Sequence, residues 1–165
     1  LEKREADIEY TEKALKANPY TVDREWPYKN VKPRIIIEQY LEDSKTSELR
    51  DYKFFCFNGR PKYIQVDIDR FKCHRRSFFT DKWESAPFTT LYEQPEKMPE
   101  KPTQLEEMLG VATKLAKDYA FARIDLYIHE NKVYFGEITL HPEGGCGIFI
   151  PDEYDFIMGD MLKLT

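Results

Sequence analysis

Two alternating runs of apolar and polar residues, "ARIDLYIH" and "VYFGEITL", flank a short polar break at residues 130–132. Successive side chains of a strand point to opposite faces, so this alternation predicts an antiparallel hairpin. With a three-residue loop at 130–132, Ile124 faces Ile138 and Leu126 faces Gly136, which completes an apolar face. The same register places Asp125 directly opposite Glu137, with Phe135, Glu137 and Thr139 together on the second face.

Facing carboxylates on neighbouring strands repel each other and destabilise a sheet. A shared proton, a basic neighbour or a divalent cation would relieve the repulsion between Asp125 and Glu137. Magnesium prefers oxygen ligands and commonly takes one or two carboxylates, and Thr139 could add a hydroxyl. Arg123 could then pair with a transferred phosphoryl group. The alternative is an ion network of Arg123 with the two carboxylates on an exposed sheet face, and the pattern alone does not separate the two.

The first half of the chain predicts one helix and more strands. A charged run with sparse apolar positions predicts a helix over 2–17, and a β-branched run predicts a strand over 34–41. Residues 51–69 predict a second hairpin around a turn at 59–61, with Tyr52, Phe54 and Cys56 on one face. A short strand is expected at 75–80.

In the second half, four prolines within 81–102 indicate a long surface connection. Thr103 and Glu106 match a capping box, and apolar residues then recur at helical spacing to about Asp118. After the hairpin at 122–140, a glycine-bearing loop and a short helix end the chain. Strands grouped in hairpins with helices between them predict an α+β fold with a mainly antiparallel sheet and flanking helices.

The composition is that of a folded chain. Aromatic residues make up 15% of the 165 positions, enough for a packed core although 33% are charged, and the net charge of -5 argues against general nucleic-acid binding. Cys56, Cys73 and Cys146 fit neither a zinc site nor a disulfide framework, which favours a cytoplasmic location. We find no apolar run of about 18 residues for a membrane span and no signal-peptide pattern. The phosphate-loop, dinucleotide, serine-hydrolase and zincin motifs are absent too.

Longer motifs resemble a known family. "RIDLY", "YFGEIT" and "HPEGG" in succession resemble the C-terminal catalytic half of the ATP-grasp superfamily, in which an R-x-D strand and an acidic strand hold magnesium and phosphates. More narrowly, "REWPYKNVKPRIIIEQYLED", "DYKFFCFNGRPKYIQV" and the hairpin run resemble the TupA-like ATP-grasp branch, named for teichuronopeptide synthesis. The resemblance spans roughly residues 10 to 165.

The resemblance implies a role for each matching position. Asp125 and Glu137 would ligate magnesium, with Thr139 where many ATP-grasp enzymes have an asparagine, and Arg123 would face the reacting phosphoryl or acyl-phosphate group. Lys53 with Asp51 would approach phosphate or ribose. The adenine edge would be read by a hinge strand formed by Glu38, Gln39, Tyr40 and Leu41.

The implied enzyme uses ATP and Mg²⁺ to activate a carboxylate as an acyl-phosphate and passes it to an amine, joining an amino acid to a uronic-acid-containing glycan in polysaccharide assembly. Residues 1–30 would be the tail of the small lobe and 31–165 the nucleotide-binding and magnesium-binding lobe. A preceding lobe is expected upstream of residue 1, so this chain alone is expected to bind nucleotide weakly. A kinase, a glycan-modifying transferase and a non-catalytic nucleotide-binding module that contacts other polysaccharide-assembly proteins are the alternatives.

Overall fold

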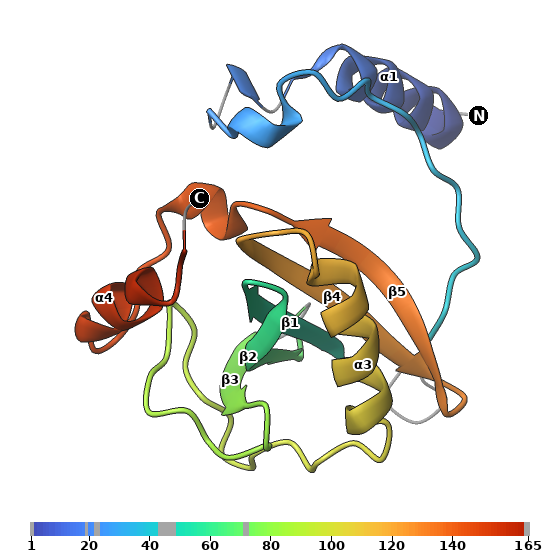
Figure 1. The fold of residues 1–165 in the computed structure, drawn as a ribbon. Coiled ribbons are helices and arrows are strands. Elements are labelled where there is room, and N and C mark those ends of the chain that lie inside the picture. Colours follow the sequence, from blue (N-terminus) through green and yellow to red (C-terminus); the bar gives the residue numbers. More distant parts are fainter. Residues whose placement is uncertain (1, 19, 22–23, 43–48, 71–72, 164–165) are drawn as a thin grey trace. The chain divides into compact units, whose positions relative to one another are not determined.

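The computed structural model describes residues 2–18, 20–21, 24–42, 49–70 and 73–163. The chain divides into two compact units, Leu1–Tyr40 and Leu41–Thr165. The first unit contains helix α1 (Glu2–Lys16), as predicted, and the short 3-10 helix η1 (Trp26–Tyr28) (Figure 1). The second unit contains the sheet and carries the polar residues discussed below.

The predicted strand at 34–41 is wrong. Residues 31–42 have no regular secondary structure, and Ile37 is 94% exposed. A β-branched run gains stability in a sheet from hydrogen bonds to a neighbouring strand and from packing on a half-buried surface. No strand pairs with this run among the residues that the structure describes. The run therefore lacks the neighbouring strand that would stabilise it in an extended, hydrogen-bonded form.

The second unit is built on a five-stranded sheet with the order β3-β2-β1-β4-β5, in which every neighbouring pair is antiparallel. This α+β arrangement confirms the predicted fold class. Asn58 and Gly59, both at positive φ, form a two-residue turn between β1 and β2, one residue earlier than predicted. The strands are β1 (Asp51–Phe57), β2 (Arg60–Ile68), β3 (Arg75–Thr80), β4 (Phe121–His129) and β5 (Lys132–Thr139).

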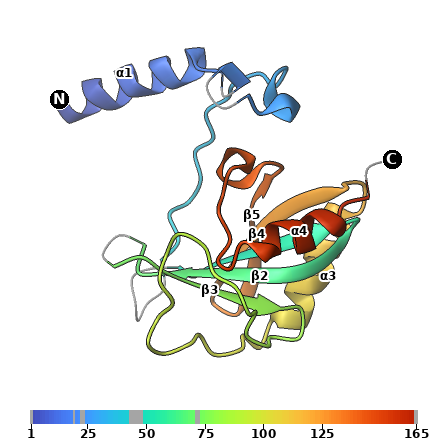
Figure 2. The same cartoon turned by 90° about the vertical axis from the view of Figure 1, so that its left-hand side faces the viewer.

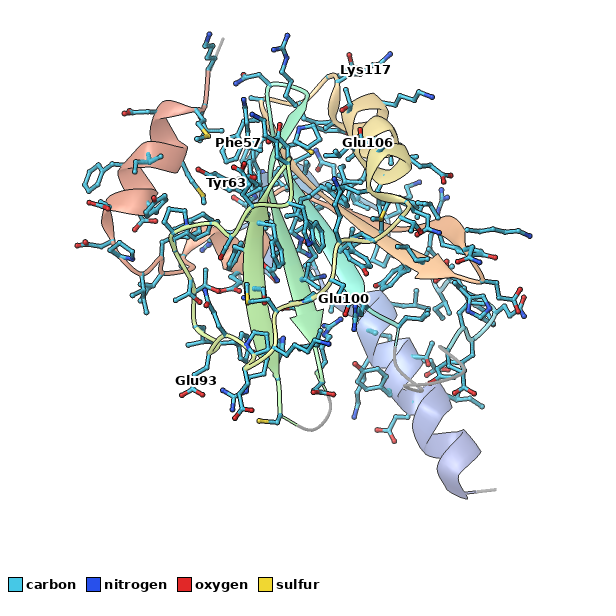
Figure 3. All side chains as sticks on the ribbon, turned by 90° about the horizontal axis from the view of Figure 1, so that it is seen from below. Phe57, Tyr63, Glu93, Glu100, Glu106 and Lys117 are labelled. Atoms are coloured by element: carbon cyan, nitrogen blue, oxygen red, sulfur yellow. The ribbon has the colours of Figure 1, made fainter. Side chains whose placement is uncertain are left out.

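Alternation along β1 divides the interior into two cores. Tyr52, Phe54 and Cys56 share one face, as predicted, and helix α3 (Leu105–Ala116) covers that face. Phe55 and Phe57 point to the other face, where helix α4 (Glu153–Asp160) contributes Met158. Figures 1 and 2 show the two helices on different sides of the sheet, and in Figure 3 the side chain of Phe57 lies on the α4 side. The second face is apolar near α4 and charged farther along the strands.

Two details of the second half differ from expectation. Helix α3 begins at Leu105 rather than at the predicted capping box, because the Leu105 amide donates to the Pro102 carbonyl in a tight turn, and Thr103 bonds the Gln104 side chain instead of capping the helix. The segment 81–102 is not only a surface connection, since Ala86 and Phe88 are buried in the second core. The 3-10 helix η2 (Pro142–Gly145) and α4 form the predicted glycine-bearing loop and terminal helix.

Candidate functional site

The turn between β4 and β5 is shorter than predicted. Glu130 and Asn131 have positive φ values of 49° and 61°, and His129 pairs directly with Lys132. The connection is therefore a two-residue turn, and the predicted three-residue loop is wrong. A turn shortened by one residue moves the register by one position near the turn.

A β-bulge restores the predicted pairing away from the turn. Ile124 lies opposite Ile138, as predicted, but Leu126 lies opposite Phe135, so Phe135 does not share the face of the carboxylates. Between these two pairs, β4 contributes Asp125 alone whereas β5 contributes two residues. An extra residue of this kind bends a strand and redirects a side chain.

The bulge is possible because residue 136 is glycine. A Cβ atom at Gly136 would lie 2.5 Å from Cε2 of Tyr127 and 3.1 Å from the backbone oxygen of Asp125. The aromatic ring thus occupies the space that a side chain on residue 136 would need. Glu137 then stands beside Asp125 on the charged face.

Arg123 relieves the repulsion between the two carboxylates. Its Nε donates to Asp125 Oδ1 over 2.7 Å, and its second terminal nitrogen lies 2.8 Å from Asp125 Oδ2, 2.8 Å from Glu137 Oε1 and 2.9 Å from Thr139 Oγ1. Burial acts to lower the pKa of Arg123, but the hydrogen bonds and negative charge of Asp125, with the charge of Glu137, raise it above its usual value. The guanidinium therefore stays charged, and the structure brings together all four residues predicted from the hairpin.

A second cation supports Asp125 from the neighbouring strand. Lys53 Nζ lies 2.5 Å from Asp125 Oδ2 and 2.5 Å from Asp51 Oδ2, and Arg70 lies 2.9 Å from the same Asp51 oxygen. Both aspartates and Lys53 are buried. Oδ1 of Asp51 is buried without a hydrogen-bond partner among the described residues. Three cationic side chains thus face three carboxylates, and their charges nearly balance.

Tyr127 is a neighbour of the site that sequence reasoning missed. It lies opposite Asp51 across β1 and β4 and on the face of Asp125. Burial, then the negative charges of Asp51 and Asp125, raise the pKa of Tyr127 to about 12, so its phenol remains protonated at physiological pH. Tyr127 follows Asp125 by two residues in the same strand, and this spacing places both side chains on one face. That spacing could have identified Tyr127 as a neighbour of the site.

A further polar cluster, also missed, continues along this face. Asp67 on β2 lies directly opposite Asp51 and accepts a 2.7 Å hydrogen bond from Arg76 Nε and a 2.8 Å bond from Gln65. Burial acts to raise the pKa of Asp67, but the hydrogen bonds and charge of Arg76, with the bond from Gln65, lower it below its ordinary value. Asp67 is thus held as a buried carboxylate.

The opposed pKa shifts of Asp67 and Asp51 predict opposite effects of pH. The lowered pKa of Asp67 adds stability that is present above the unfolded value of about 3.9 and is lost as pH falls. Burial raises the pKa of Asp51 despite Lys53, so the stability that Asp51 adds is present below the unfolded value of about 3.9 and is lost as pH rises above that value. Between about pH 5 and pH 3 we expect the free energy of unfolding to fall less in Asp67→Asn than in the unchanged chain and more in Asp51→Asn. Urea unfolding at each pH measures this, and equal losses in all three proteins would contradict it.

The predicted adenine-reading residues lie at the boundary between the two compact units. Glu38, Gln39 and Tyr40 belong to the first compact unit, and Leu41 is the first residue of the second. Glu38, Gln39 and Tyr40 are exposed, and none of the four belongs to a helix or strand. Their role in binding the nucleotide stays a prediction.

The hairpin offers the type of ligand that a hard cation prefers, oxygen atoms, but too few of them to fill its coordination shell. Asp125, Glu137 and Thr139 offer carboxylate and hydroxyl oxygens side by side, and the Glu137 side chain is 61% exposed. Within the described part of the chain, no group of three or more His, Cys, Asp or Glu residues is placed to hold a metal ion. Magnesium commonly completes its shell with water and phosphate oxygens, so these residues fit the ion when it arrives with a nucleotide.

The antiparallel sheet, its flanking helices and an R-x-D strand beside an acidic strand form an α+β arrangement consistent with an ATP-grasp lobe. The family model described as TupA-like ATPgrasp matches residues 2–163. The chain therefore belongs to the TupA-like ATP-grasp family. Comparison with curated proteins and with solved structures found no match in either. None of the helices in the described ranges is long and apolar enough to cross a membrane.

Proposed function

We propose that this chain binds ATP and magnesium for a carboxylate-amine ligase that proceeds through an acyl-phosphate. Membership of an ATP-grasp family supports a ligase-like, ATP-dependent activity. The observation that carries the proposal is the convergence of Arg123, Asp125, Glu137 and Thr139 on one sheet face, with Arg123 contacting the other three. This is the set of groups that phosphoryl transfer needs, because it offers oxygen ligands beside a planar cation.

Each residue has a distinct part in the proposal. Asp125, Glu137 and Thr139 would hold magnesium, which when bound neutralises charge on phosphate oxygens. Arg123 would bind the transferring phosphoryl group through its planar fork of donors. Lys53 holds Asp125 in place from β1, and with Asp51 we assign it to the side of the site nearest phosphate or ribose.

The balanced charges of the cluster imply that metal and nucleotide bind together. Lys53, Arg70 and Arg123 already face the three carboxylates, so a free divalent cation meets little net attraction. Phosphate groups add negative charge and draw Arg123 toward themselves, which frees carboxylate oxygen for the ion. We therefore expect magnesium alone to bind poorly and to bind well only beside a nucleotide.

Calorimetric titration with ADP plus magnesium tests the site. Glu137→Gln is expected to weaken magnesium-dependent binding by at least about 10-fold to 100-fold, the loss usual when even an outer-shell partner of a metal ligand is removed. Glu130→Gln is the matched control, since it makes the same chemical change in the same hairpin, at the exposed turn. Unchanged binding should be seen in the control. Equal binding in Glu137→Gln would remove the hairpin carboxylates from the proposed site.

For the reaction, we propose that a substrate carboxylate oxygen attacks the γ-phosphorus of ATP, ADP leaves, and an amine then displaces phosphate from the acyl carbon. The proposed substrates are an amino acid and a uronic-acid-containing glycan of a cell-surface polysaccharide or teichuronopeptide, in the cytoplasm. Hydroxylamine in place of the amine would trap a hydroxamate from an acyl-phosphate. A phosphorylated product that yields no hydroxamate would instead identify a kinase.

A further inference from the structure

A second buried guanidinium, that of Arg76 on β3, lies on the same face of the sheet as the candidate site. Its side chain is 7% exposed. Asp67 holds its Nε over 2.7 Å, Thr90 lies 3.1 Å from one terminal nitrogen, and the ring of Tyr92 lies 4.6 Å from the guanidinium carbon. Partners on several sides therefore fix the orientation of this cation.

The Arg76 cluster is continuous with the proposed nucleotide site. Arg76 pairs with Asp67 across β2 and β3, and Asp67 pairs with Asp51 across β1 and β2. Lys53 then links Asp51 to Asp125. A ligand that extends along this face from the phosphate-binding residues would meet Arg76.

One further partner of Arg76 differs from the others. Glu143, in the loop after β5, lies 2.9 Å from a terminal nitrogen of Arg76, and its side chain is 43% exposed. The Asp67 side chain, by contrast, is 1% exposed and also accepts a hydrogen bond from Gln65. Of the two carboxylates on Arg76, Glu143 is thus the one that solvent can reach and that can leave.

The backbone at Glu143 is unfavourable for its residue type. Glu143 has φ 52°, in the left-handed region, and Gly144 and Gly145 follow at 64° and 75°. A non-glycine residue held there costs of order 1–3 kcal/mol and persists only when its surroundings compensate. The ion pair with Arg76 compensates part of this cost, together with the hydrogen bond that the Cys146 amide donates to the Glu143 carbonyl. A competing anion on Arg76 would remove one of these two contacts.

We infer that Arg76 is a binding site for a carboxylate group of the substrate, and that the chain's own Glu143 occupies this site in the present structure. The inference rests on the proposed function in one respect, because it adds a second anchoring point for a substrate that also reaches the phosphate-binding residues. The chemical class of the proposed ligand follows from the observed contact, since the group that Arg76 binds in this structure is the carboxylate of Glu143. A planar guanidinium held in a fixed orientation binds such a group with both distance and direction defined.

Arg75, the preceding residue on β3, supplies the matched control. It pairs with Glu93, whose side chain is 83% exposed. This second arginine-glutamate pair lacks the buried partners that orient Arg76. Exposed pairs of this kind contribute little, so releasing Arg75 should create no defined site.

The test is an NMR titration of the whole chain with acetate at constant ionic strength, following the backbone amide signal of residue 76 in every variant and, where arginine is present, its Nε–H signal. Acetate should bind weakly to the unchanged protein, because it must displace Glu143, and about tenfold more tightly to Glu143→Gln, the factor set by removing one charged competitor. Glu93→Gln should bind acetate as the unchanged protein does. Arg76→Gln in the Glu143→Gln background should lose the tighter acetate binding. Arg76→Lys in the same background should lose it too, and this variant keeps the buried positive charge, so it serves as the test if Arg76→Gln does not fold.

Unchanged acetate affinity in Glu143→Gln, or an equal gain in Glu93→Gln, would overturn the assignment. Inorganic phosphate binding more tightly than acetate at Arg76 would overturn the carboxylate class. Because the titration contains neither nucleotide nor magnesium, a failure here leaves the test of Glu137 untouched, and a failure of that test leaves this one untouched.

Discussion

Replacing Asp125 with asparagine is expected to lower the free energy of unfolding by about 3–5 kcal/mol, the cost of breaking a buried ion pair from one side. Asp125 is fully buried and receives both Arg123 and Lys53. The neutral amide cannot satisfy both Arg123 and Lys53, and its NH₂ group would point a donor at one of these cations. Denaturant unfolding monitored by circular dichroism measures the loss.

Glu137→Gln separates this structural role from the proposed role in binding. The Glu137 side chain is 61% exposed and shares Arg123 with Asp125, so its replacement should change stability by no more than about 1 kcal/mol. A stable Glu137→Gln protein with weakened magnesium-dependent ADP binding would show that Glu137 serves binding alone, whereas Asp125 serves both binding and stability. Similar stability losses in both variants would mean that the buried network does not depend on Asp125 in the way its contacts indicate.

Gly136→Ala is expected to destabilise the protein by about 1–3 kcal/mol, the usual cost of overpacking. The added methyl would stand 2.5 Å from Cε2 of Tyr127 and 3.1 Å from the Asp125 carbonyl oxygen. Either the Tyr127 ring moves or the bulge opens, and the second response would displace Glu137 and weaken ADP and magnesium binding as well. Thermal or denaturant unfolding, followed by the same calorimetric titration, measures both effects.

Gly110→Ala is the control for this prediction. Gly110 lies within α3, and a Cβ there meets no atom within 4 Å, so alanine should stabilise the helix by about 1 kcal/mol. Combining Gly136→Ala with Tyr127→Leu should recover part of the loss, because the ring edge that clashes is gone. Additive losses in the double variant would place the strain elsewhere in the bulge.

Much of this site could be predicted from local patterns. Alternation placed Asp125 on the face opposite Ile124 and put Tyr52, Phe54 and Cys56 together on one face, because strand geometry has a period of two and applies wherever a strand forms. Repulsion between Asp125 and Glu137 requires a positive partner, and Arg123 supplies it. The local pattern does not distinguish a basic side chain from a metal cation in that place.

The predictions failed where the outcome depended on neighbours distant in sequence. The β-branched run at 34–41 has strand propensity but no pairing strand among the described residues. The bulge at Gly136 follows from a turn one residue shorter than expected and from the ring of Tyr127 on the adjacent strand. Neither requirement is visible in a single run of residues.

By itself, the sequence determined the α+β class, the two central hairpins, the two faces of β1 and the grouping of Arg123, Asp125, Glu137 and Thr139. These follow from local periodicity and from residues within one hairpin. Tertiary structure decided the contacts that join separate strands and loops: Lys53 between two aspartates, Asp67 opposite Asp51, and Glu143 on Arg76. The physical reason is that a buried charge is stable only beside a partner, and which partner it meets depends on strand order and register rather than on distance along the chain.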